Sequence, residues 1–252
     1  MRLATFNILH GRSPEDGRVD LDRLARAVRQ LDADVLALQE VDHYQARSQS
    51  ADLTAVAAEA MGAVSHRFVA ALTGTPGATW EAATGEAQPE EAAYGVALLS
   101  RYPVSAWQVV RLPALSRRAP VVVSGGRVVM AVDEPRAAVA ACVDSPTGPL
   151  TVVSTHLSFV PWWNGRQLKR LVRGLAPSPR PLVLMGDLNM SPARAGRLTR
   201  WRALARDLTF PAPAPERQLD HILLDGMAPA TQTAGRAVRL DLSDHRALAV
   251  DL

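Results

Sequence analysis

The sequence predicts an α/β protein in which two sheets are covered by helices. Three observations lead to this prediction. A strand–helix–strand pattern opens the chain, closely spaced strands with tight turns fill its middle, and a strand–helix–strand pattern returns in the last third. The 252 residues contain no linker, repeat or shift of composition, so we expect one domain over residues 1–252.

The first third of the chain alternates predicted strands with predicted helices. Short apolar runs predict three strands, at 3–6, 35–39 and 66–72. The second of them is expected to end at Glu40. A helix is predicted at 20–31, where an aspartate can cap the first turn and apolar residues recur on one face. Another is predicted at 52–61, because a glycine typical of helix ends follows it.

The middle of the chain is predicted to form antiparallel strands. A run rich in Gly, Pro, Ala and Glu at 73–93 first predicts a mobile loop. Six strand-like segments follow, at 95–100, 106–112, 120–123, 127–132, 137–143 and 150–155. Turn signals separate several of them, at 124–126, 133–135 and 145–149. Strands joined by such short turns pair antiparallel.

The last third is predicted to hold one amphipathic helix and three strands. At 164–176, leucines recur on one helical face, and Arg166, Arg170 and Arg173 fall on the other. The three strands are expected at 181–187, 219–225 and 245–252.

Composition excludes several classes of protein. Hydrophobic residues make up 48% and charged residues 21%, which is typical of a folded chain. No apolar run is long enough to span a membrane and no export signal is visible, so we expect a cytoplasmic protein. Cys142 is the single cysteine, which rules out an internal disulfide and a four-cysteine zinc site. We expect Cys142 to be buried in a strand.

The net charge of +3 says little about partners, but the local distribution says more. Ten basic residues and one acidic residue, Asp187, lie between Arg166 and Arg206. Such a field suits an anionic ligand. A solvated arginine face explains the same residues equally well.

Polar residues recur where the predicted strands begin or end. They are Asn7, Glu40, His156, Asp187, Asn189, Asp220, Asp244 and His245. Carboxylates and amides at the ends of buried strands are costly to desolvate unless something uses them. A hard divalent cation with a phosphate would do so, because oxygen ligands suit Mg²⁺ and histidines suit phosphate binding or proton transfer.

The motifs around these residues resemble the endonuclease/exonuclease/phosphatase (DNase I-like) superfamily, and its small bacterial metal-dependent phosphoesterases in particular. The segments are TFNILHG, LALQEVD, YGVALLSRYP, STHLS, MGDLNMSP, LDHILL and LSDHRAL, in the family's order. The resemblance implies a four-layer α/β/β/α sandwich of two mixed, largely antiparallel sheets. Thr-His in STHLS departs from the abasic-site endonuclease pattern, which favours the branch with DNase I, sphingomyelinases and small phosphoesterases.

The resemblance also implies roles for individual residues. Glu40, Asn7 and Asp244 are expected to bind Mg²⁺, for which Mn²⁺ can substitute. Asp187 and Asn189 are expected to orient the attacking water, and Asn189 and His156 to contact the phosphate. His245, oriented by Asp220, and His156 are the expected catalytic histidines. Tyr94 resembles an active-site tyrosine, and Arg136 a phosphate contact. Which group is the general base stays open.

These residues predict a Mg²⁺-dependent hydrolase of a phosphodiester or phosphomonoester. A nuclease that uses the arginines of 166–206 is the alternative, and nucleic acid is a possible but not the favoured partner. A non-catalytic binding protein on the same fold is the third possibility. Three features are left between two interpretations. His10 lies at the rim of the site or outside it, Trp162-Trp163 forms a pocket wall or packs over a helix start, and His43 with Asp42 supports the site or is ordinary loop polarity.

Overall fold

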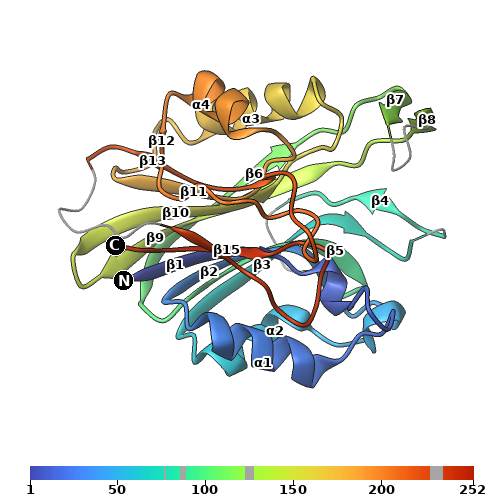
Figure 1. Cartoon of the computed structure of the whole chain (residues 1–252), viewed down its shortest axis with the longest axis horizontal. Coiled ribbons are helices and arrows are strands. Elements are labelled where there is room, and N and C mark those ends of the chain that lie inside the picture. Colours follow the sequence, from blue (N-terminus) through green and yellow to red (C-terminus); the bar gives the residue numbers. More distant parts are fainter. Residues whose placement is uncertain (77, 86–88, 123–127, 228–234) are drawn as a thin grey trace.

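Two sheets pack face to face, and each carries helices on its outer face (Figure 1). The computed structural model describes residues 1–252 except 77, 86–88, 123–127 and 228–234. Within these residues the first sheet has seven strands. In spatial order they are β14 (Arg236–Val238), β15 (Ala247–Asp251), β1 (Arg2–Asn7), β2 (Val35–His43), β5 (Ala93–Ser100), β3 (Ser65–Thr73) and β4 (Glu81–Ala82).

The second sheet has six strands in the described part of the chain. Their order is β12 (Arg202–Ala203), β13 (Asp220–Asp225), β11 (Leu182–Asp187), β10 (Gly148–His156), β9 (Arg136–Ser145) and β6 (Val104–Leu112). In each sheet one neighbouring pair is parallel, β1 with β2 and β10 with β11. The other pairs are antiparallel, so the predicted mixed, largely antiparallel sandwich is confirmed. A separate hairpin pairs β7 (Ala119–Val122) with β8 (Val128–Ala131).

Helices α1 (Leu21–Leu31) and α2 (Leu53–Met61) cover the first sheet. Helices α3 (Trp163–Gly174) and α4 (Pro192–Thr199) cover the second. Short 3-10 turns occur at Leu9–Gly11 and Ala46–Ser48. The predicted caps are present: the Asp20 carboxylate accepts from the Arg23 amide at 3.0 Å, and Gly62 ends α2 with a φ of 69°. No helix in the described ranges is long and apolar enough to cross a membrane.

Three apolar clusters hold the layers together. Leu3, Val35 and Leu98 belong to the cluster between the two sheets. Leu24 of α1 packs in the cluster under the first sheet, and Leu168 of α3 in the cluster over the second. All five side chains are fully buried, and each such burial contributes roughly 1.5–3 kcal/mol. The apolar residues that recur in the sequence are therefore the ones that pack between these layers.

The strand registers bring the ends of several strands to one edge. Asn7 at the end of β1 pairs with Gln39 of β2, next to Glu40. His156 at the end of β10 pairs with Asp187 at the end of β11. Asp187 also pairs with Asp220 at the start of the antiparallel β13. Residues far apart in the sequence thus meet at one end of the sandwich.

The structure corrects some local predictions. Strand β2 does not end at Glu40 but continues to His43 through a bulge between Gln39 and Val41. The expected loop at 73–93 contains β4, which pairs with β3. Helix α4 and strands β12 and β14 were not predicted, because they are too short to show a clear hydrophobic period. Cys142 lies in β9 but is only half-buried. The predicted turn at 124–126 lies outside the described residues.

Candidate active site

A cavity of about 670 Å³ opens at the edge where the strand ends meet. Seven of the predicted site residues line it: Glu40, Tyr94, Arg136, His156, Asp187, Asn189 and His245. Two more, Asn7 and Asp220, lie directly behind this lining in hydrogen-bond contact with it. These nine predicted residues therefore belong to one site.

The bulge in β2 aims Glu40 into the cavity. The Glu40 backbone is left-handed, with a φ of 55°, and the register of β2 with β5 shifts across it. A bulge of this kind interrupts the side-chain alternation of a strand. Glu40 is consequently half-exposed, while Gln39 and Val41 on either side are completely buried.

Asn7 joins two carboxylates. Its amide nitrogen donates to Glu40 Oε1 at 3.1 Å and to Asp187 Oδ2 at 3.2 Å. Its amide oxygen accepts from the Leu9 backbone at 3.2 Å. Asn7 therefore holds the two acidic groups together across the two sheets. To offer its oxygen to a cation instead, as predicted, the amide would have to turn over.

Backbone constraints fix Asp187. Gly186, just before it, has a φ of 147°, and a Cβ there would lie 1.9 Å from the Thr155 carbonyl oxygen. Only glycine allows β10 and β11 to approach so closely. After Asp187 the chain turns sharply, because Asn189 is left-handed and its amide donates to Asp187 Oδ1 at 2.9 Å. Burial is the main reason that the pKa of Asp187 rises to about 7.

His245 and Asp220 form a buried pair. His245 Nδ1 lies 2.9 Å from Asp220 Oδ2, and His245 Nε2 lies 3.7 Å from Asp187 Oδ2. Burial alone would lower the pKa of His245, but the neighbouring Asp220 and Asp187 charges outweigh it and raise the pKa to about 10. His245 is therefore an imidazolium, and its Nε2–H faces the cavity.

His156 has the opposite protonation state. Burial and the Arg136 charge hold the pKa of His156 well below its usual range, so the ring is neutral. Arg136 Nη1 lies 3.2 Å from His156 Nδ1, and a guanidinium can only donate. The proton is thus on Nε2, which lies 3.5 Å from Asp187 Oδ2. This tautomer leaves Nε2 no lone pair for the Asn189 amide nitrogen at 3.2 Å, so that amide donates to the Leu157 carbonyl at 3.0 Å.

Arg136 is a buried cation whose hydrogen-bond donors are not all used. The side chain is 5% exposed, its Nη2 lies 3.5 Å from Glu134 Oε2, and its Nε has no hydrogen-bond partner among the described residues. Buried guanidinium groups normally use all their donors. The free N–H of Arg136 beside the cavity is therefore suited to an anionic ligand.

Tyr94 closes another wall of the cavity. Burial raises the pKa of Tyr94 well above its ordinary value, so the phenol keeps its proton and can donate it in a hydrogen bond. Arg47 lies over the ring, 5.6 Å from its centroid, and the Trp80 ring is 5.7 Å away. Asp42 fixes Arg47 through two bonds, at 2.7 and 2.8 Å. Asp42 thus supports the site indirectly.

The donor set fits a divalent cation. Burial raises the pKa of both Glu40 and Asp187, and the neutral Asn7 amide bridges the two carboxylates. Carboxylate oxygens are the ligands that a hard cation prefers. Ligand atoms of Asp187, Asp220 and His245 also lie within 4.8 Å of one another, but the hydrogen bond between Asp220 and His245 already occupies two of these groups.

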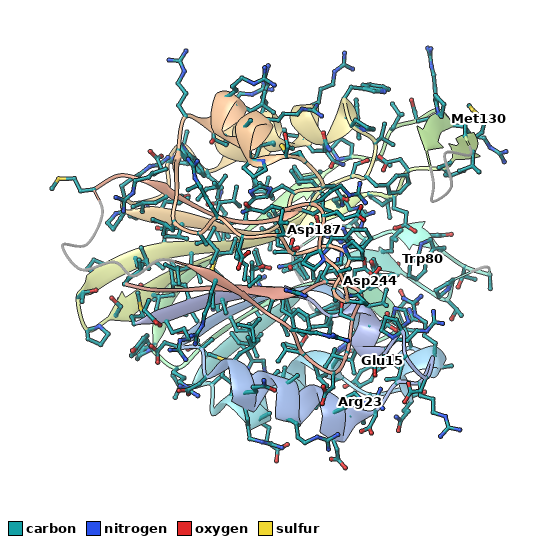
Figure 2. The ribbon with its side chains drawn as sticks, viewed as in Figure 1. Glu15, Arg23, Trp80, Met130, Asp187 and Asp244 are labelled. Carbon is teal, nitrogen blue, oxygen red and sulfur yellow. The ribbon has the colours of Figure 1, made fainter. Side chains whose placement is uncertain are left out.

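Asp244 does not reach the cavity in this conformation. It is half-buried, does not line the cavity, and acts on it through charge, raising the pKa of Glu40 and His245. Figure 2 shows Asp187 between the two sheets, with Asp244 on the first-sheet side of it. Of the three predicted metal ligands, Glu40 is the one whose carboxylate directly faces the cavity.

Sequence reasoning missed part of the cavity wall. Phe210 packs on the His245 ring, with the two ring centroids 4.9 Å apart. The Arg217 guanidinium lies over the Phe210 ring, 5.0 Å from its centroid. Glu134 accepts from Trp80 Nε1 at 3.3 Å and neighbours Arg136. These residues lie outside apolar runs and family-like motifs, so no local signal marked them.

Other polar and aromatic residues lie outside the cavity lining. The His221 ring contacts the Met190 carbonyl oxygen at 2.9 Å. Trp162 and Trp163 meet edge to face and pack over the start of α3. His10, in the turn Leu9–Gly11, does not line the cavity.

Comparisons with known proteins agree with this fold. The model of the Endonuclease/Exonuclease/phosphatase family matches residues 4–245. A search of curated proteins finds no match. An endonuclease/exonuclease/phosphatase from Beutenbergia cavernae is similar in structure, with a TM-score of 0.70 and 23% identity over 99% of this chain and 70% of that one.

Two further structures carry more specific names. A mannosyl-6-phosphatase from Bacteroides thetaiotaomicron has a TM-score of 0.66 and 15% identity, over 100% of this chain and 98% of that one. Sphingomyelinase C from Streptomyces griseocarneus has a TM-score of 0.65 and 17% identity, over 99% and 98%. At these identities the likeness concerns the fold. With the family model matched over nearly the whole sequence, the chain belongs to the endonuclease/exonuclease/phosphatase family.

Proposed function

We propose that the protein is a Mg²⁺-dependent phosphoesterase that hydrolyses a phosphodiester or phosphomonoester by attack of water on phosphorus. One observation carries this proposal: the cavity places a pair of carboxylates beside a charged and a neutral histidine and a buried arginine with a free donor. A phosphate ester is anionic, so its hydrolysis needs charge neutralisation, an oriented water and a protonated leaving group. The cavity offers a group for each requirement.

Glu40, with Asn7 after its amide turns over, would hold the cation, and Asp244 would contribute to its binding through charge. Bound there, Mg²⁺ or Mn²⁺ would neutralise the phosphate oxygens. Arg136 offers its free Nε–H to the same phosphate, and Tyr94 adds a phenol donor. These two residues would fix the ester against the floor of the cavity.

Four residues would handle the proton transfers and the developing charge. Asp187 would accept a hydrogen bond from the attacking water, since its Oδ2 faces both histidines. His245 would donate from Nε2, because Asp220 holds its other nitrogen. His156, neutral with its proton on Nε2, and Asn189 would stabilise developing negative charge as donors.

A nuclease remains the alternative because of the arginines after residue 166. Arg166, Lys169, Arg170 and Arg173 line a separate hollow on α3, with none of the cavity residues in its wall. A phosphate bound in that hollow would not contact the strand-end residues that line the cavity. A small or lipid-like phosphate ester is therefore favoured over a nucleic acid.

A substrate panel with and without Mg²⁺ tests the proposal. We expect hydrolysis of bis-p-nitrophenyl phosphate or p-nitrophenyl phosphate that stops in EDTA and returns with Mg²⁺. His245→Ala should abolish it, and Glu59→Gln, which changes an exposed carboxylate on α2, should not. Turnover that is faster on plasmid DNA than on every small ester would favour the nuclease. Failure on all substrates with every metal would favour a binding protein.

A further inference from the structure

An unpartnered apolar stripe lies on the β7–β8 hairpin. Val128, Met130 and Val132 are exposed by 57–64%, among the highest values for large apolar residues in the described chain. They occupy alternate positions, so they share one face of β8 and its extension. Figure 1 shows the hairpin projecting beyond the two sheets, and Figure 2 shows Met130 on it, at the outside of the molecule. Contiguous exposed apolar surface of this kind marks an interaction site.

The stripe is continuous with the mouth of the cavity. Met130 pairs directly with Pro120 of β7, so both side chains are on the same face of the hairpin. Pro120 lines the cavity. Pro161 also lines the cavity and precedes Trp162, which is 49% exposed. Apolar residues from two separate segments of the chain therefore adjoin the cavity.

Cations lie next to both parts of this apolar surface in the chain. Arg117 and Arg118 are exposed just before β7, and Arg166 lies 5.3 Å over the Trp162 ring. Lys169 and Arg170 continue the positive charge along α3. In the described part of the chain, no carboxylate lies within 4.0 Å of any of these five cations. Exposed valine, methionine and tryptophan beside cations that have no carboxylate partner match an anionic bilayer, with its apolar interior and negative headgroups.

We propose that the stripe of Val128, Met130 and Val132, together with Trp162, docks the protein on an anionic phospholipid bilayer. Nucleic acid offers the charge but no partner for the stripe, and in a symmetric contact between two copies the same cations would face one another. Docking in this orientation would turn the cavity mouth toward the headgroups. A lipid phosphate ester is then the substrate class of the site, an extension that rests on the proposed function, whereas docking itself does not.

Vesicle co-sedimentation in EDTA tests docking without turnover. We expect binding to vesicles of phosphatidylcholine mixed with phosphatidylglycerol, and much weaker binding to phosphatidylcholine alone. Met130→Glu with Val132→Glu should lower the affinity at least about tenfold, since the apolar burial is lost. Arg117→Gln with Arg118→Gln should lower it about fivefold per arginine, and this loss should shrink in high salt.

Two matched controls carry the same chemical changes elsewhere. Val64→Glu alters a valine that is 66% exposed next to β3, at the end of the sheet opposite to Tyr94. Arg26→Gln with Arg29→Gln alters exposed arginines of α1. Both should bind vesicles as the unchanged protein does. All variants should keep their thermal unfolding and their turnover of soluble bis-p-nitrophenyl phosphate.

Three outcomes would overturn docking. They are no binding to either vesicle, unchanged binding in Met130→Glu with Val132→Glu, and a dimer in solution that these changes dissociate, which would make the stripe an interface between copies. Vesicle binding without turnover of any ester would instead refute the proposed function and leave docking standing.

Discussion

His245 Nδ1 lies 2.9 Å from Asp220 Oδ2, and both side chains are buried. The two residues come from different sheets. Asp220 begins β13 of the second sheet, and His245 precedes β15 of the first. A buried carboxylate holding one ring nitrogen fixes which nitrogen faces the cavity. The pair should therefore act as a unit.

Asp220→Asn should reproduce much of the activity loss of His245→Ala, on the order of 10²–10⁴-fold in kcat. The double variant should lose little more than either single variant, because the residues share one role. Steady-state kinetics on a soluble ester measure this, with Asp144→Asn, an exposed aspartate of β9, as the control. Losses that multiply would show that the two residues act independently.

The same pair should make stability depend on pH. The folded-state pKa of His245, about 10, exceeds its ordinary 6.5, so the native state binds this proton more tightly than the unfolded state. Its contribution is fully present below pH 6.5 and is lost as the pH rises through 10. Urea unfolding from pH 6 to pH 10 should show a steeper fall in unfolding free energy for the unchanged protein than for Asp220→Asn. Equal slopes would argue against the charged pair.

Glu40→Gln should weaken cation binding, since it removes a carboxylate that faces the cavity. A loss of about tenfold or more is expected, because changes even behind the ligands of a metal site cost that much. Calorimetric titration with Mn²⁺ measures affinity without relying on turnover. Glu59→Gln should titrate like the unchanged protein, and full affinity in Glu40→Gln would place the cation elsewhere.

Gly186→Ala should destabilise the fold by about 3 kcal/mol or more. Its φ of 147° disfavours a side chain, and the new Cβ would meet the Thr155 carbonyl oxygen. Gly196→Ala in α4 is the matched control, since nothing lies within 4 Å of a Cβ there. That change should be neutral or stabilise by up to about 1 kcal/mol. Chemical denaturation compares the two, and similar stability for both variants would contradict the close approach of β10 and β11.

Arg170→Ala with Arg173→Ala should change neither activity on small phosphate esters nor DNA binding, which we expect to be weak. The two arginines are exposed on α3 and line a hollow separate from the cavity. Fluorescence anisotropy with labelled DNA at several salt concentrations measures the binding. Submicromolar binding at physiological salt, lost in the double variant, would favour the nuclease.

The sequence by itself determined the layers and most of the site. Helices α1 and α2 could be predicted because caps such as Asp20 and Gly62 and the spacing of apolar residues are local signals. The strand-end polar residues could be predicted for the same reason, since a buried strand that stops at a carboxylate stands out against its apolar neighbours. Short elements such as α4 carry too few residues for a period to emerge.

Only the tertiary structure decided how these residues meet. The direction of the Glu40 side chain depends on a bulge against β5. The tautomer of His156 depends on Arg136 in a neighbouring strand. The position of Asp244 outside the cavity depends on the path of the chain before β15. Phe210 reaches His245 from a segment with no recognisable motif. Local patterns in a sequence fix periodicity and chain breaks, whereas these features depend on register and on contacts between distant segments, which come into being only when the two sheets pack.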